Sequence, residues 1–540
     1  MIRKLILTTA VLVSWSCPDV CADDQAGEHI SGLTLRQKVG QLLLLGFQGK
    51  DLDAKDSAHI RKLSPGGIVF YRRNFGDASG ITLLISNIKA IFGKNSLPMF
   101  FAVDQEGWIV HRIGGELYTP PSAPSIGAIG SEELARETGL AVGSALRRLG
   151  ININLAPVLD VPADIIASPM TTRCFSNDFK TVEALGASYI RGLKAAGLLA
   201  TAKHFPGIGR AQGDAHHKLP HIRWDNTGEK DNDILPFTGA IKAGADMIMV
   251  GHVITEPGDT ANPVSLSSYW MRDVLRKEMG FDGLIIVDNI EMKAIKDIMS
   301  VPKAAVKAFK AGADVIMVSH ERKNQMAVFD ALLNAVRTGD IPMERLDDSL
   351  RRIADAKKKI MSYSSKEPDS TLLVLSRQVA EGSVSDVRLK NVPYGDISRK
   401  ARVLYAGSNI RMIEVVKDFF SYAGTLDVSL LQYKKMNPEI GIEEFIRRFD
   451  GVIIDASYPD AADILSLCNE HNVEYVVLLS SYPSYTLKTI ERLQPKRMVI
   501  TLENSTSHLH AAVEVISGLR QAKGTLPYKI RLPQDYTYTK

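Results

Sequence analysis

Residues 203–220 hold the densest group of chemically active side chains in this sequence of 540 residues. Two lysines, three histidines and an aspartate lie here in a glycine-rich loop that follows an apolar run. Asp214 and His216 are two residues apart, so the loop can fold the carboxylate onto one imidazole nitrogen and leave the other facing a substrate. Such a pair fixes the tautomer and raises the basicity of the ring, as a general acid/base requires. We therefore predict proton transfer by His216; the alternative is a solvated turn that Asp214 caps.

A second candidate, Asp288, directly follows the aliphatic run Leu284–Val287. A charge at the end of a buried strand is costly unless it faces a polar cleft, so we expect Asp288 at the mouth of a site. A carboxylate placed there can attack an anomeric carbon and form a covalent glycosyl-enzyme that water later cleaves. The His216–Asp214 pair would then protonate the leaving oxygen at neutral pH. The alternative interpretation of Asp288 is a cap of the following helix.

Further polar side chains at strand ends are candidates for ligand binding. Asp104 ends another apolar run and is suited to hydrogen bonds with sugar hydroxyls, while Glu106 is expected instead to cap the next helix. Lys203 and His204 carry donors for hydroxyl groups. Arg173 lies in a loop after a further strand and is a candidate for binding an amide carbonyl or a carboxylate of the ligand.

The elements that must position these residues are short apolar runs separated by helical patterns. The runs are continuous rather than alternating, which is typical of parallel strands buried on both faces. Eight such units over roughly 300 residues predict a (β/α)8 barrel, whose strand ends converge on one catalytic face. The eight runs span residues 41–47, 67–71, 99–104, 151–157, 199–205, 246–252, 284–288 and 314–320.

The rest of the chain predicts a second, smaller unit. Residues 344–360 are typical of an amphipathic helix that closes a domain over residues 30–362, and residues 363–394 are expected to form a linker and a connecting helix. A C-terminal α/β domain is expected over residues 395–540, with His508 and His510 but no dense polar cluster. The predicted fold class is thus α/β: a TIM (β/α)8 barrel followed by a smaller α/β sandwich domain. Its expected strands span residues 402–407, 451–455, 473–481 and 497–502.

Composition and the N-terminus bear on partners and location. The net charge of +4 is small for this length, which argues against nucleic acid as a partner. Residues 1–22 have a basic start, a short apolar run and small residues at a cleavage position, so we expect a signal peptide rather than a membrane span. Export to the periplasm or the medium follows, with lipidation at Cys17 as the alternative. Only Cys174 and Cys468 would then remain, which predicts no disulfide framework.

From about Leu33 to Ile360 the sequence resembles glycoside hydrolase family 3, in its β-N-acetylglucosaminidase branch. The loop at 203–220 is the most specific match, because the β-glucosidase branch of the family lacks it. The other matching segments are residues 37–41, 66–70, 104–107 (Asp-Gln-Glu-Gly), 156–161, and 280–283 leading to Asp288 and Glu291.

The resemblance implies a role for each candidate residue. Asp288 is the expected nucleophile and His216, held by Asp214, the expected acid/base. The implied function is removal of terminal N-acetylglucosamine from cell-wall (muropeptide-type) or related glycans, with retention of configuration and without a cofactor. The residues expected to hold the sugar are Asp104, Arg173, Lys203 and His204.

The sequence also departs from the family pattern near the site. Ile208 stands where the family has His, and Trp108 and Ile109 stand where it has Gly and Arg. These changes affect contacts to the sugar ring, and Trp108 offers a stacking face for a sugar or packs against a helix. The departures also leave a non-catalytic glycan-binding relative as an alternative.

Two further alternatives concern the chemistry. A histidine acid/base carries no negative charge to repel phosphate, so a phosphorylase is an alternative to a hydrolase. A metal-dependent hydrolase is an alternative from another mechanism class, because His204, His216, His252 and Asp288 are all possible metal ligands. The first strand lacks a His-x-His pair, which disfavours a metal site.

Overall fold

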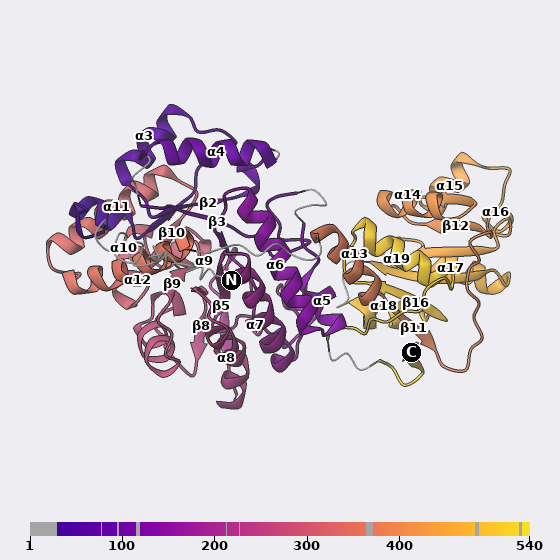
Figure 1. The fold of residues 1–540 in the computed structure, drawn as a ribbon. Helices are drawn as coiled ribbons and strands as arrows, with labels where there is room; N and C mark the ends of the chain where they lie inside the picture. The colour runs from indigo at the N-terminus through magenta and orange to yellow at the C-terminus, as the bar shows by residue number, and fades with distance from the viewer. Residues whose placement is uncertain are drawn as a thin grey trace, which may run out of the picture.

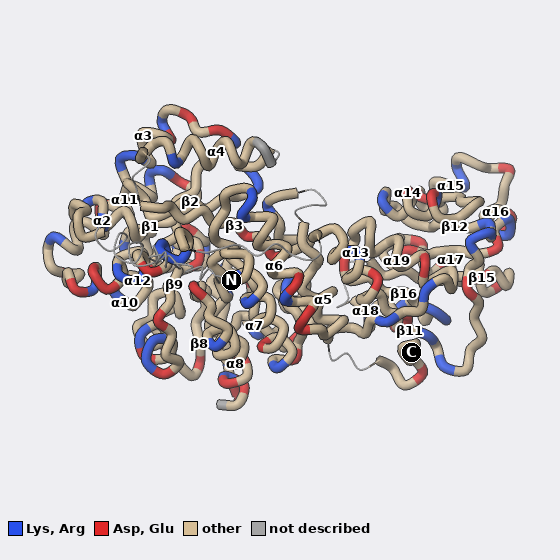
Figure 2. Tube along the Cα trace, viewed as in Figure 1, with Lys and Arg blue, Asp and Glu red and all other residues tan. Residues whose placement is uncertain are grey.

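The chain forms two lobes, a barrel and a smaller sheet domain (Figure 1). The computed structural model describes residues 30–76, 78–93, 97–114, 119–211, 213–225, 227–362, 371–480, 485–528 and 532–539. The predicted signal peptide, residues 1–22, lies outside the described residues. Within the described ranges, no helix has the length and apolar character needed to cross a bilayer. Figure 2 shows acidic and basic residues interspersed over both lobes.

Eight parallel strands close into a barrel in the order β1-β10-β9-β7-β5-β4-β3-β2. Every residue of these strands is buried, as expected of aliphatic runs covered on both faces. Each of the eight predicted runs contains one of the strands, which confirms the predicted barrel. The strands are β1 (Leu43–Leu45), β2 (Gly67–Phe70), β3 (Phe100–Val103), β4 (Ile153–Asn154), β5 (Leu199–Phe205), β7 (Met247–Val250), β9 (Leu284–Val287) and β10 (Val315–Val318).

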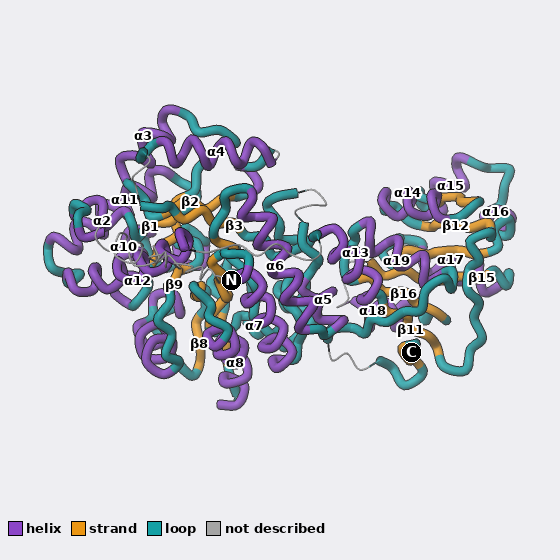
Figure 3. Tube along the Cα trace, in the orientation of Figure 1, coloured by secondary structure: helices purple, strands orange, loops and turns teal. Residues whose placement is uncertain are grey.

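Helices surround the barrel (Figure 3). Two short strands outside the barrel, β6 (His221–Arg223) and β8 (Ile254–Glu256), pair in parallel. The helices are α2 (Leu35–Gly40), α3 (Ala54–Leu63), α4 (Ala78–Ala90), α5 (Ala123–Ile129), α6 (Glu132–Arg148), α7 (Phe179–Ala195), α8 (Thr227–Lys242), α9 (Lys293–Lys296), α10 (Val301–Ala311), α11 (Arg322–Arg337) and α12 (Met343–Ser362), with short 3₁₀ turns at Arg72–Asn74 and Val264–Leu266 and a π-helix at Tyr269–Glu278.

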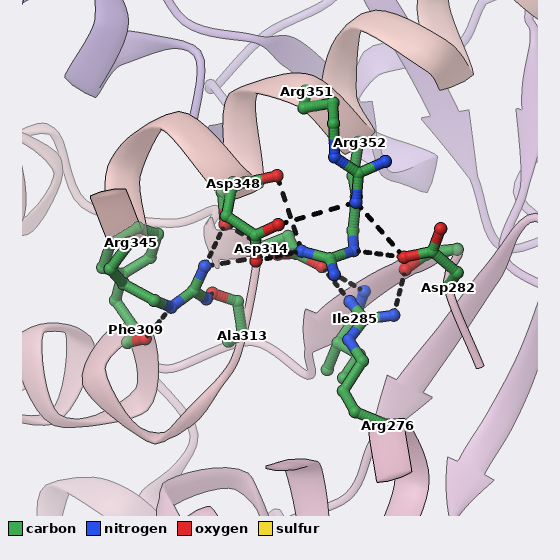
Figure 4. A network of polar contacts seen from close by, with 12 residues as sticks. Arg276, Asp282, Ile285, Phe309, Ala313, Asp314, Arg345, Asp348, Arg351 and Arg352 are labelled. Carbon is green, nitrogen blue, oxygen red and sulfur yellow. Dashed lines mark hydrogen bonds and ion pairs between the residues drawn. The ribbon is translucent and has the colours of Figure 1, made fainter. Parts of the chain in front are cut away.

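A network of arginines and aspartates binds helix α12 to the amino-terminal ends of β9 and β10 (Figure 4). Its centre is Asp314, whose side chain is fully buried and accepts hydrogen bonds from the Arg276 guanidinium, the Ser349 hydroxyl and the Ile285 backbone. A buried carboxylate is tolerated only when its oxygens are fully engaged, and here they are. The network therefore closes the barrel on the face opposite to the strand ends that carry the candidate site.

The same helix carries a lysine buried without an ion pair. The Lys357 ammonium donates to Gln41 Oε1 at 2.6 Å and lies 5.1 Å from the centre of the Phe100 ring, and no carboxylate pairs with it in the described part of the chain. Burial lowers the pKa of Lys357 from 10.5 to about 7. Because the unfolded chain binds this proton up to its ordinary pKa, the free energy of unfolding should rise between pH 7 and pH 10, by at most about 1.4 kcal/mol per pH unit.

Lys357→Met is expected to remove this rise, which urea unfolding at pH 7, 8, 9 and 10 measures. Below pH 7 the folded wild type must hold a buried charge, so the variant's free energy of unfolding should exceed that of the wild type by the largest amount there. Lys358→Met, at the next, half-buried position of α12, is the matched control and should keep the slope. If the free energy of unfolding of the Lys357 variant rose with pH as steeply as that of the wild type, Lys357 would not be the source of the pH dependence.

The C-terminal lobe is a seven-stranded sheet in the order β13-β12-β14-β15-β16-β11-β17. Its parallel part has the order 2-1-3-4-5 of a doubly wound sheet, with antiparallel β11 and β17 at one edge. The segment predicted to link the domains thus holds a strand, β11, as well as the helix α13. The elements are α13 (Leu372–Ser383), β11 (Ser385–Leu389), β12 (Arg402–Ala406), α14 (Ile410–Phe419), β13 (Tyr422–Leu426), α15 (Leu430–Met436), α16 (Ile442–Ile446), β14 (Gly451–Asp455), α17 (Ala461–Glu470), β15 (Glu474–Ser480), α18 (Thr486–Leu493), β16 (Arg497–Thr501), α19 (Thr506–Ile516) and β17 (Tyr536–Tyr538).

A buried polar cluster joins the two lobes. The His508 imidazole is fully buried, with Nδ1 2.9 Å from Glu503 Oε1 and Nε2 3.2 Å from the Ser125 hydroxyl of the barrel. The second Glu503 oxygen accepts the Ser122 backbone N–H at 2.7 Å. Glu503 and His508 are near each other in the sequence, but their barrel partners Ser122 and Ser125 are 381 and 383 residues away from them, so the expectation of no dense polar cluster in this domain missed this interdomain cluster. The cluster holds the C-terminal domain against the loop that follows β3.

Candidate active site

The predicted nucleophile lies at the carboxyl end of β9 and faces the barrel mouth. Asp288 is half-buried; one of its carboxylate oxygens accepts the Asn289 backbone N–H at 2.7 Å, and it forms no ion pair in the described part of the chain. Burial raises the pKa of Tyr71, at the end of β2, and the charges of Asp104 and Asp288 raise it further. Tyr71 is therefore close to both carboxylates, and the structure brings Asp104 and Asp288 to one mouth, as predicted.

Lys203 and the two acidic residues after β3 form a buried ion cluster. The Lys203 ammonium is 2.8 Å from Asp104 Oδ1 and 2.6 Å from Glu106 Oε1. Burial alone would raise the pKa of Asp104 and of Glu106, but the adjacent cations hold both pKa values below the ordinary range. The same carboxylates keep the pKa of Lys203 above its ordinary value despite burial. All three groups are therefore charged at neutral pH, and Asp104 is a fixed acceptor for ligand hydroxyls.

Arg173 completes the cluster from the loop after β4. Its Nε and one terminal nitrogen donate to the two oxygens of Glu106, at 2.8 and 2.7 Å. This bidentate pair fixes the guanidinium plane behind Lys203. The structure thus shows Arg173 as a partner of Glu106, and its predicted direct contact with a ligand stays a prediction. The expectation that Glu106 caps the next helix was wrong: its carboxylate is instead shared by the two cations Lys203 and Arg173.

His204 is oriented by a buried carboxylate that the sequence did not single out. Its Nδ1 is 2.7 Å from Asp160 Oδ2, and the second oxygen of Asp160 accepts the backbone N–H groups of His204 and Ile208. Asp160 has no exposed surface, so it acts only through its partners. A carboxylate on Nδ1 leaves Nε2 of His204 available to a ligand. Ile208, a departure from the family pattern, is thus anchored through its backbone.

The predicted acid/base pair is formed. His216 Nδ1 lies 2.7 Å from Asp214 Oδ1, and the imidazole side chain is 69% exposed. Partial burial alone would raise the pKa of Asp214, but hydrogen bonds from the His216 backbone and ring hold it below the ordinary value. The loop contacts the segment after β9, because the Ala294 N–H donates to the Ala215 carbonyl at 3.2 Å. The loop that carries Asp214 and His216 is therefore docked on the segment that follows Asp288.

His252, one of the possible metal ligands, contacts the protein through both ring nitrogens. His252 Nδ1 is 2.7 Å from the Ser265 hydroxyl and Nε2 is 3.1 Å from the Asn289 carbonyl. Burial lowers the pKa of His252, so the ring is held neutral. Among the described residues, no group of three or more His, Cys, Asp or Glu side chains is placed to hold a metal ion.

The loop after β3 brings Trp108 to the rim of the site. Gln105, which is fully buried, accepts the backbone N–H groups of Arg112 and Ile113 and donates to the Ile113 carbonyl. The resulting turn positions the Arg112 guanidinium 3.3 Å from Asp104 Oδ2. Trp108 has a positive φ of 38° and is half-buried, so the turn holds it in a conformation that few large residues adopt.

A closed barrel that carries carboxylates after β3 and β9, a buried ion cluster and a His–Asp pair at the carboxyl ends of its strands has the elements of a glycosidase-type site. The family model for the glycosyl hydrolase family 3 N-terminal domain matches residues 34–356, more than half of the chain. The chain therefore belongs to glycosyl hydrolase family 3 and is a glycoside hydrolase.

Individual relatives agree with this placement. The chain is 33% identical over 292 residues to a beta-hexosaminidase of Photobacterium profundum, covering 54% of this chain and 85% of the relative. It is 34% identical over 296 residues to a beta-hexosaminidase of Tolumonas auensis, covering 54% and 86%. A solved family 3 beta-N-acetylglucosaminidase from Paenibacillus sp. str. FPU-7 is similar over both lobes, with a TM-score of 0.80, 30% identity, and coverage of 92% of this chain and 99% of that one.

Proposed function

We propose that the protein is an exo-acting, retaining β-N-acetylglucosaminidase that removes terminal N-acetylglucosamine from glycans. The observation that carries the proposal is the His216–Asp214 pair on a loop docked beside the segment that follows Asp288. The names of the related hexosaminidases and of the Paenibacillus structure support the choice of sugar.

The proposed reaction has two steps at one carbon atom. Asp288 attacks the anomeric carbon and forms a glycosyl ester, while His216 Nε2 gives its proton to the departing glycosidic oxygen. The neutral imidazole then takes a proton from water, and the resulting hydroxide displaces Asp288 from the sugar. Asp214 accepts a hydrogen bond from Nδ1 in both steps, so Nε2 is the nitrogen that first gives up a proton and then takes one from water.

Asp104, Lys203, His204 and Arg173 are proposed to bind the N-acetylglucosamine. Asp104 and Lys203 have opposite charges fixed 2.8 Å apart, and together they offer an acceptor and a donor to neighbouring hydroxyl groups. His204, which follows Lys203 on β5, offers a further donor. Because the deepest of these groups are buried, the pocket is suited to the terminal sugar of a chain.

The natural substrate is proposed to be a cell-wall (muropeptide-type) fragment met outside the cytoplasm. The basic and apolar N-terminal segment supports export as a periplasmic or secreted protein, with lipidation at Cys17 as the alternative. Comparing the mass of the mature N-terminus with those expected for cleavage before Asp23 and for acylated Cys17 tests this.

The stereochemistry of the first product tests the proposal. NMR during cleavage of an aryl β-N-acetylglucosaminide should show the β-anomer first, and the α-anomer first would overturn the covalent route. Glycosyl phosphate formed in phosphate buffer would identify a phosphorylase, and sugar binding without turnover a non-catalytic relative. Loss of turnover on chelation, with recovery on adding metal, would favour a metal-dependent hydrolase.

His216→Ala should slow cleavage most for substrates whose leaving group must be protonated before it can depart. For kcat/KM we expect a loss of about 10²–10⁴-fold with an alkyl leaving group and a much smaller loss with dinitrophenol, which departs without a proton. His217→Ala, at the neighbouring exposed histidine, is the matched control and should leave the dependence on leaving group unchanged. An equal loss across leaving groups in the His216 variant would exclude it as the acid.

A further inference from the structure

One buried carboxylate closes the base of the loop that carries His216, which we call the His216 loop (residues 211–220). Asp233, in the second turn of α8, is 3% exposed, and its Oδ2 lies 3.2 Å from Nε of Arg210 and 2.7 Å from Nε1 of Trp224. Arg210 directly precedes the loop, and Trp224 follows it after the short strand β6. Both N–H groups therefore donate to the same oxygen atom from opposite ends of the loop, as in a compact surface loop whose two ends meet.

The Trp224 end of the His216 loop is packed into the protein. The Trp224 indole is buried against Trp270, with ring centroids 5.8 Å apart, and the Trp224 backbone N–H donates to the Glu256 carbonyl at 2.8 Å. The three residues before Trp224 form β6, which pairs with β8. Asp233 is thus oriented by a fixed donor, and it holds Arg210 in turn.

At the other end, the Arg210 side chain links the loop to α8. Its ion pair with Glu229, one turn before Asp233, is longer than its ion pair with Asp233, at 3.4 Å against 3.2 Å. Burial raises the pKa of Asp233 to about 6, although the Trp224 N–H and the Arg210 charge oppose the rise. Asp233 is therefore mostly ionised at neutral pH. A hydrogen bond between ionised groups is roughly twice as strong as one between neutral groups, so this contact can fix the end of a loop.

The tip of the His216 loop is exposed to solvent. The His216 imidazole side chain is 69% exposed, and the Ala294 N–H holds the tip by donating to the Ala215 carbonyl at 3.2 Å. The imidazole must come within hydrogen-bond reach of the glycosidic oxygen before it can give up its proton. Its position therefore depends on how firmly the two ends of the loop are held.

We infer that Asp233 is a positioning residue for proton transfer: by binding Arg210 and Trp224 with one oxygen atom, it closes the base of the His216 loop and sets where the imidazole lies. The inference rests on the proposed function and deepens it. Asp233 is buried on α8 and acts through the loop, without touching the substrate.

The test measures kcat/KM, which reports the steps up to formation of the glycosyl ester, for two substrates of the full-length protein at pH 7.5. One N-acetylglucosaminide has an alkyl leaving group that needs a proton, and the other has dinitrophenol, which departs without one. Asp233→Asn keeps an acceptor for the Trp224 N–H but removes the charge that holds Arg210, and Arg210→Gln removes the other partner. We expect each variant to lower kcat/KM about tenfold for the alkyl substrate and less than about twofold for the dinitrophenyl substrate.

The two substitutions remove the same contact, so the double variant should lose no more than either single variant. Asp231→Asn, at an exposed position of α8, and Arg223→Gln, at an exposed position of β6, are the matched controls and should leave both rates unchanged. Three results would each overturn the inference: an equal loss for the two substrates, as a merely structural role would give, no loss in either variant, or additive losses in the double variant.

Unfolding curves show whether each variant folds. If Asp233→Asn does not fold, Arg210→Gln carries the same comparison alone, because the Arg210 side chain is partly exposed. A dependence on leaving group in His216→Ala that neither Asp233→Asn nor Arg210→Gln shows would overturn this inference and leave the proposed function standing. Failure of the wild type to cleave either substrate would instead count against the proposed function.

Discussion

Replacing Asp288 with asparagine is expected to lower kcat/KM for an aryl β-N-acetylglucosaminide by at least about 10⁴-fold. An amide cannot attack the anomeric carbon, and it carries no charge to stabilise the oxocarbenium-like transition state. The fold should be unaffected, because the asparagine oxygen can still accept the Asn289 N–H that Asp288 now binds at 2.7 Å. Initial rates with purified variant, together with its unfolding curve, measure both effects.

Asp282→Asn is the matched control for this variant. Asp282 lies just before the other end of β9, where it is exposed and pairs with Arg351 and Arg352 (Figure 4). The control should keep full activity, since that end of the strand is remote from the barrel mouth. More than about 1% residual activity in the Asp288 variant would contradict its role as nucleophile.

Lys203→Met is expected to have the largest effect on stability. The substitution leaves Asp104 and Glu106 buried without their shared cation, and breaking a buried pair in this way costs about 3–5 kcal/mol. Asp104 should also lose its fixed position, so kcat/KM should fall about 100-fold even under conditions in which the variant is folded. Urea unfolding and initial rates on the same preparation measure the two losses.

A double variant separates charge from packing. Adding Glu106→Gln to Lys203→Met removes one of the two carboxylate charges that Lys203 had balanced, although Arg173 then loses its ionic partner. We expect the double variant to be more stable than the sum of the two single losses predicts. Simple additivity would show that the cluster acts through packing and not through charge.

The barrel strands were predictable because each is a continuous aliphatic run. The strand that escaped prediction at one edge of the C-terminal sheet, β13, reads Tyr-Ala-Gly-Thr-Leu and is only partly buried, so it lacks that signal. Strand β11 reads Ser-Asp-Val-Arg-Leu, and its pairing with β16 and β17 depends on segments more than a hundred residues away. Local pattern thus identifies buried parallel strands but not those whose stability comes from distant partners.

In the candidate site, too, contacts between residues close in the sequence were predictable and contacts between distant residues were not. Asp214 and His216 are two residues apart, so their contact follows from a loop. Glu106 and Arg173 are 67 residues apart, and Asp160 and His204 are 44 apart, so their pairing depends on the closed barrel. The sequence therefore identified the groups that we propose to face a substrate more readily than Glu106 and Asp160, the carboxylates that hold Arg173 and His204. A strand-end signal before Asp160 was present, in the apolar segment 151–157.

The central claim is that the carboxylate of Asp288 forms a bond to the sugar. A 5-fluorinated N-acetylglucosaminyl fluoride should transfer its sugar to the enzyme with loss of fluoride, because the second fluorine slows hydrolysis of the glycosyl ester. Peptide mapping by mass spectrometry should then place the added sugar on Asp288. Attachment to any other residue, or turnover of the reagent through a product of inverted configuration, would contradict the account.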